Sequence, residues 1–131
     1  MDECDFAAFA AELGQYPTTS LKPGEFLFRE GDEADALYIV SHGTLRVITG
    51  SAVLEVVHGG GLIGEMAIVD TDAPRSASVI AGTHVELIRI DKSDFFALVA
   101  GAPQFAVMVM RVMARRLRSM NKRYRPQATA W

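Results

Sequence analysis

The sequence has one cysteine, one tryptophan and three histidines among its 131 residues. Cys4 has no second cysteine to pair with, which excludes a disulfide within the chain and favours a reducing compartment. His42, His58 and His84 lie far apart, and none has a close histidine neighbour of the kind that holds a metal ion. We therefore expect no metal site and no metal-dependent catalysis.

Long hydrophobic runs are also missing. The longest apolar stretches, around residues 95–100 and 105–110, are far too short to cross a bilayer. The first 12 residues are acidic rather than basic, so they do not resemble a secretory signal. These features predict a cytoplasmic protein that makes no membrane contact.

Acidic residues are absent from the last part of the chain. All 16 acidic residues lie within residues 1–110, together with six of the 13 basic ones. Residues 111–131 contain the other seven basic residues. This basic segment predicts a solvated helix face, an acidic partner or a neighbouring subunit. Nucleic acid is the weakest interpretation, because no helix-turn-helix segment follows the helix expected here.

The composition is that of a folded domain. Half of the residues are hydrophobic, and the length suits one domain over residues 1–131. Short apolar or alternating segments separated by glycine-rich and acidic turns predict an antiparallel β-barrel or jelly roll over residues 21–90. The expected strands begin at Phe26 and cover residues 36–40, 45–48, 53–57, 77–80 and 85–90, with a stub at 62–63.

Helices are expected on both sides of the barrel. Residues 3–13 favour a short helix within an N-terminal segment 1–14, and residues 16–24 form a polar loop with two prolines. Two helices are expected over residues 91–123, capped by Asp91 or Ser93 and broken at residues 101–103. The second has apolar residues at helical spacing: Phe105, Met108, Val109, Val112, Met113, Leu117 and Met120.

The segment 64–79 has the strongest chemical pattern in the chain. Glu65 follows a glycine and begins a short helical turn, while Arg75 comes ten residues later, between Pro74 and Ser76. A carboxylate can accept a hydrogen bond from a sugar hydroxyl, and an arginine with free backbone amides can hold a phosphate. The same two residues could instead form a structural ion pair on a barrel loop.

Several motifs in the right order resemble the cyclic nucleotide-binding domain family. The opening strands of that family are similar to residues 21–25 and 28–32, and its next element to residues 37–40 followed by Gly43. Its phosphate-binding cassette is similar to residues 64–67 and 74–79. The resemblance implies a mainly β, jelly-roll domain with C-terminal helices, which binds cAMP or cGMP for signalling and has no other cofactor.

The resemblance also assigns roles in the cassette. Glu65 would accept from the ribose 2′-hydroxyl and Arg75 would bind a phosphate oxygen. The amides of Gly64, Ala67 and Ala77 and the hydroxyl of Ser76 would complete the phosphate site. An apolar wall would come from Val47, Leu62, Ile63 and Met66; relatives often have an aromatic residue where this chain has Ile63.

In relatives the last helix closes over the base as a lid. The candidates for that contact here are Arg115, Arg118, Lys122 and Tyr124. The expected function is a non-enzymatic sensor that relays ligand binding to an unidentified effector protein or through self-association. Two alternatives remain: a structural module with an unoccupied pocket, and a cupin-type barrel enzyme.

Overall fold

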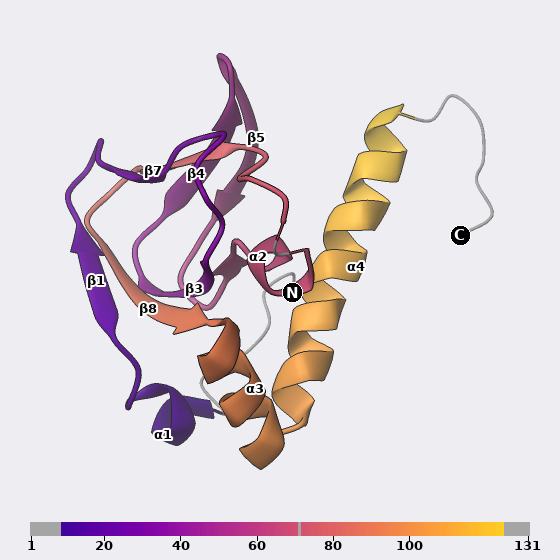
Figure 1. The fold of residues 1–131 in the computed structure, drawn as a ribbon. Coiled ribbons are helices and arrows are strands. Elements are labelled where there is room, and N and C mark those ends of the chain that lie inside the picture. The colour runs from indigo at the N-terminus through magenta and orange to yellow at the C-terminus, as the bar shows by residue number, and fades with distance from the viewer. Residues whose placement is uncertain (1–8, 71, 125–131) are drawn as a thin grey trace.

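The fold is described by a computed structural model for residues 9–70 and 72–124 (Figure 1). It contains eight strands and four helices within those residues. The strands are β1 (Thr18–Leu21), β2 (Phe26–Phe28), β3 (Ala36–His42), β4 (Leu45–Thr49), β5 (Ala52–Val57), β6 (Leu62–Ile63), β7 (Ser78–Ala81) and β8 (Val85–Asp91). The helices are α1 (Ala10–Leu13), α2 (Met66–Val69), α3 (Lys92–Gly101) and α4 (Gln104–Tyr124).

The strands form two four-stranded antiparallel sheets. One has the order β1-β8-β3-β6 and the other β2-β7-β4-β5. Apart from the β4–β5 hairpin, neighbours in each sheet are not consecutive in the sequence; for example, Leu37 of β3 lies opposite Ile90 of β8. This arrangement confirms the predicted jelly roll followed by helices.

Both faces of β3 are covered, which explains why its sequence is almost continuously apolar. Val40 and the half-buried Tyr38 pack into the core between the sheets. Leu37 and Ile39 face the other way and pack against the helices. A strand covered on both faces needs apolar residues at successive positions.

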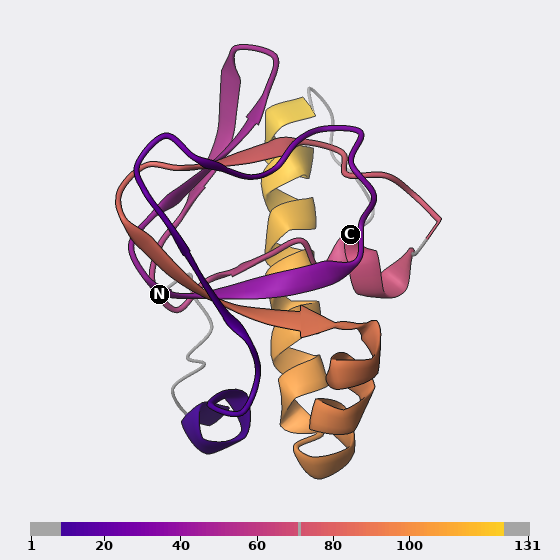
Figure 2. The same cartoon turned by 60° about the vertical axis from the view of Figure 1, so that its left-hand side comes forward.

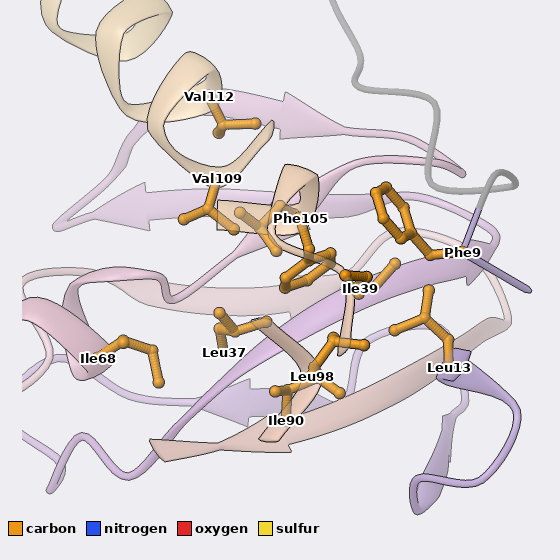
Figure 3. Packing of buried hydrophobic residues seen from close by; sticks show 12 residues of the cluster. Phe9, Leu13, Leu37, Ile39, Ile68, Ile90, Leu98, Phe105, Val109 and Val112 are labelled. Atoms are coloured by element: carbon orange, nitrogen blue, oxygen red, sulfur yellow. The ribbon is translucent and has the colours of Figure 1, made fainter. Parts of the chain in front are cut away.

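The helical side of the core joins α1, α3 and α4 to the first sheet (Figure 3). Phe105 is fully buried there, and its ring lies 5.5 Å from that of Phe9 in an edge-on arrangement. Val109 and Val112 continue the buried stripe along α4. The first half of α4 is therefore held by apolar packing.

Asp91, one of the two predicted caps, is the N-cap of α3, whereas Ser93 lies inside the helix. Oδ1 of Asp91 accepts from the amide of Asp94 at 2.8 Å, and the two residues form a reciprocal capping box. The break at 101–103 is also confirmed, because α3 ends at Gly101 and α4 begins at Gln104. Figure 2 shows α3 beside the first turns of α4 below the barrel, while the rest of α4 continues upward alongside the barrel.

Three expectations were wrong or only partly tested. Residues 18–21 were expected in a loop but form β1, which pairs with β8 along its whole length. Leu117 and Met120 were expected in the apolar stripe of α4 but are 41% and 49% exposed, so the buried part of the stripe ends at Val112. The predicted helix 3–13 lies mostly outside the described residues, and its described part is helical at Ala10–Leu13.

The described part of the chain contains no helix that is both long enough and apolar enough to cross a membrane.

Candidate functional site

A cavity of about 1050 Å³ lies between the barrel and α4. Its walls come from β4, β5 and β6, from α2 with the loop 73–77, and from the second half of α4. All ten residues predicted to bind ligand line it: Val47, Leu62, Ile63, Gly64, Glu65, Met66, Ala67, Arg75, Ser76 and Ala77. Segments distant in the sequence thus meet at one site.

Glu65 and Arg75 are the two charged residues that are buried in the described part of the chain. Burying a charge is unfavourable unless it is paired and hydrogen-bonded. They do not pair with each other: Glu65 pairs with an arginine of α4, and Arg75 pairs with Asp35. The alternative of a structural Glu65–Arg75 ion pair is therefore wrong.

Arg75 is held on several sides. Its Nη2 donates to the carbonyl of Ala36 at 2.8 Å and lies 3.6 Å from the Asp35 carboxylate. Its guanidinium also lies 3.9 Å from the centre of the Phe28 ring. Burial lowers the pKa of Arg75, although an arginine remains charged at any physiological pH.

One donor of Arg75 is unused. Its Nε is buried and has no hydrogen-bond partner among the described residues. A buried donor without an acceptor is costly, and a ligand oxygen would remove that cost. An anion bound at this arginine would therefore complete a site that the protein leaves incomplete.

Gly64 allows the chain to approach Arg75 closely. Its φ is +81°, in the region that favours glycine. A Cβ at this position would lie 2.8 Å from Nη1 of Arg75 and 3.2 Å from the Ala36 carbonyl oxygen. Any other residue would therefore disturb both the turn and the arginine.

Glu65 is bound by Arg116, a residue that the sequence analysis did not select. Nη1 of Arg116 lies 2.6 Å from Oε1 of Glu65. Its Nε donates to both carboxylate oxygens of Glu55 at 3.0 and 3.2 Å, and its Nη2 donates to the Leu62 carbonyl. Burial by itself would lower the pKa of Arg116, but Glu65 and Glu55 outweigh that effect and raise it.

Helical spacing could have identified Arg116. It follows the buried Val112 by four residues and Val109 by seven, so it continues the face of α4 that meets the barrel. Glu55 carried no comparable signal, because one acidic residue in an exposed hairpin is typical of solvated strands. Only the fold brings it to the cavity.

The other predicted residues have mixed outcomes. Arg115 and Arg118 line the cavity. Lys122 and Tyr124 lie in the last turn of α4, and their side chains are outside what the structure describes. The Ala67 amide donates to the Gly64 carbonyl at 3.1 Å, within the turn that begins α2. Its role in holding a phosphate stays a prediction.

No group of three or more histidine, cysteine, aspartate or glutamate side chains positioned to hold a metal ion is found among residues 9–70 and 72–124.

Comparison with known proteins identifies similar chains. Residues 18–101 match the family model described as a cyclic nucleotide-binding domain. The cyclic AMP receptor protein of Thermus thermophilus is 32% identical over 122 residues, which cover 89% of this chain and 54% of the relative. A lysophospholipase of Aspergillus fumigatus is 31% identical over 105 residues, which are 76% of this chain but 7% of that enzyme.

The fold has a counterpart of known structure. The crystal structure of the Thermus thermophilus catabolite activator protein matches 89% of this chain at 30% identity, with a TM-score of 0.79. The match covers 57% of that protein, so this chain spans about half the length of such regulators. The family match, the shared fold and the buried Glu65 and Arg75 together lead to one assignment. This chain belongs to the cyclic nucleotide-binding domain family.

Proposed function

We propose that this protein is a non-enzymatic sensor that binds a purine 3′,5′-cyclic mononucleotide, cAMP or cGMP, in the cavity between the barrel and α4. The observation that carries the proposal is the burial of Glu65 and Arg75 in one cavity without a bond between them. A cyclic nucleotide offers a hydroxyl to the carboxylate and a phosphate to the guanidinium. It therefore satisfies both groups at once.

The phosphate would lie at Arg75 and the loop 74–77. The unused Nε of Arg75 would donate to it, in addition to Nη1 or Nη2. Ser76 is exposed to the cavity and supplies a hydroxyl donor. The turn and loop hydrogen bonds of the described residues use neither the Gly64 amide nor the Ala77 amide, which supports their role as further donors.

The ribose would lie at Glu65. Arg116 occupies Oε1 of that carboxylate, and the remaining oxygen can accept from the 2′-hydroxyl. Arg116 would orient Glu65 and also connect the sugar site to α4. We propose that α4 is the lid and that Arg116 joins it to the bound sugar.

The signal would leave the domain through α4. Val107, Met110 and Leu117 leave apolar surface exposed along this helix, outside the cavity. A partner protein or a second copy of the chain could read a change in that surface, since exposed apolar stripes mark interaction sites. Nucleic acid is not part of the proposal, although the relative from Mycobacterium tuberculosis is named as a transcriptional regulator.

Titration calorimetry with cAMP and cGMP tests the proposal. We expect at least one of them to bind, and we expect Arg75→Ala to weaken binding by about 2–4 kcal/mol, because the phosphate loses its main cation. Arg46→Ala, which removes an exposed arginine outside the cavity, should bind as the unchanged protein does. No binding of either nucleotide by the unchanged protein would favour the structural module with an unoccupied pocket.

A further inference from the structure

Only two of the residues that line the cavity are acidic, and one of them has no place in the binding of sugar or phosphate. Glu65 is assigned to the ribose. Glu55, on β5, is 38% exposed and accepts from Nε of Arg116 with both oxygens. One guanidinium thus lies between two carboxylates, which places Glu55 next to the sugar site.

The phosphate and the sugar would take two ends of the cavity, so the purine base would lie in the part that remains. The phosphate end is closed by Arg75 and the sugar end by Glu65. The remaining walls are β4 and β5, with Val47, Leu54 and Glu55, and the second half of α4, with Ser119 and Met120. A purine attached to a ribose on Glu65 would enter this space, with apolar side chains against its faces and Glu55 at its edge.

A carboxylate distinguishes the two common purines. Guanine carries N1–H and the 2-amino group side by side, so it offers two neighbouring donors to two acceptor oxygens. Adenine offers its 6-amino group beside N1, which is an acceptor and repels a carboxylate. An arginine next to the carboxylate adds a donor that suits O6 or N7 of guanine.

We propose that Glu55 is a specificity-determining residue that contacts the base and makes this site prefer cyclic GMP to cyclic AMP. The inference rests on the proposed function, because it needs a nucleotide in this cavity with its ribose on Glu65. Arg116 remains bound to Glu55 through Nε, and a carboxylate has enough lone pairs to accept from both the arginine and guanine.

The unchanged protein tests this with three nucleotides in titration calorimetry. Cyclic GMP should bind at least about tenfold more tightly than cyclic AMP, since a paired carboxylate of this kind discriminates by roughly that factor. Cyclic IMP retains N1–H and O6 but lacks the 2-amino group, so its affinity should fall between the two. Equal affinities, or tighter binding of cyclic AMP, would overturn the inference.

Glu55→Gln gives the sharper comparison. The amide offers one acceptor and one donor, which complement N6–H and N1 of adenine, so the preference should fall to below twofold or reverse. Glu86→Gln, on β8 outside the cavity, should leave the tenfold preference intact. A tenfold preference retained by Glu55→Gln would show that another group reads the base and would overturn the assignment.

Two results distinguish failure of this inference from failure of the proposed sensor function. Binding without preference leaves the sensor in place and removes the role of Glu55. No binding of any of the three nucleotides removes both. Circular dichroism checks that Glu55→Gln is folded. If it is not, Glu55→Ser replaces it, and this variant should also lose the preference for cyclic GMP.

Discussion

Arg75 and Gly64 show how closely the cassette depends on single residues. Arg75 is buried against Phe28, and the backbone of Gly64 passes so near that its carbonyl is 3.4 Å from Nη1 of Arg75. The glycine conformation makes that approach possible, because a side chain here would collide with the guanidinium. The backbone conformation of Gly64 and the position of the Arg75 guanidinium are therefore coupled.

Gly64→Ala should destabilise the protein and also weaken nucleotide binding. The positive φ costs a non-glycine residue about 1–2 kcal/mol, and the Cβ would push on Arg75. Urea unfolding measures the first effect and calorimetry the second.

Gly24→Ala is the matched control. Gly24 has a φ of +89° but no atom within 4 Å of a built Cβ. It should lose similar stability and keep its full affinity for nucleotide. If both variants lost affinity equally, contact with Arg75 would not be the cause.

The start of α3 shows how one element is defined by its cap. The Asp91 carboxylate accepts from the Asp94 amide, which would otherwise have no partner at the helix N-terminus. This hydrogen bond holds the pKa of Asp91 below its usual value. The charged form is favoured in the folded state, so its contribution to stability is present at neutral pH and is lost as the pH falls below the usual aspartate pKa.

Asp91→Ala should lower the free energy of unfolding by about 1 kcal/mol at pH 7. The difference in unfolding free energy between the variant and the unchanged protein should shrink as the pH falls below about 4, because protonation of the Asp91 carboxylate removes the same interaction from the unchanged protein. Asp91→Asn keeps a capping oxygen that does not titrate, and it should remain close to the unchanged protein at pH 7. Urea unfolding at both pH values measures this; a deficit of the same size at pH 3 would contradict it.

Across the whole molecule, α4 is attached in two different ways. Its first half is anchored by apolar packing of Phe105, Val109 and Val112 against the sheet. In its second half, the ion pairs of Arg116 reach the cavity, while Leu117 and Met120 remain exposed. If the proposed function holds, we expect the second half of α4 to be the part whose position responds to a ligand.

Arg116→Ala should increase the mobility of the second half of α4, from Met113 onward, and leave residues 104–112 unchanged. Amide hydrogen exchange should speed up by about fivefold or more from Met113 onward and stay unchanged over residues 104–112, because only the second half loses its attachment. Nucleotide should slow exchange there in the unchanged protein but not in the variant. Arg111→Ala, at an exposed position, is the control; a uniform change along α4 would contradict two separate attachments.

The positions of most strands, the cassette and the capped α3 could be predicted from local patterns. These patterns are the alternation of apolar and polar residues, the glycine turns, the capping residue Asp91 and the spacing of Glu65 from Arg75. Each involves residues close together in the chain, so it can be recognised without knowledge of the fold. β1 could not be found this way, because its polar residues become a strand only by pairing with β8.

The sequence therefore specified the family, the jelly roll and the two charged groups of the cassette, since each depends on residues close together in the chain. The partners of those groups depended on the packed fold: Arg116 lies 51 residues from Glu65 and 61 from Glu55, and Asp35 lies far from Arg75 in the sequence. No local pattern encodes such pairs, because they form only where the barrel closes and α4 packs against it.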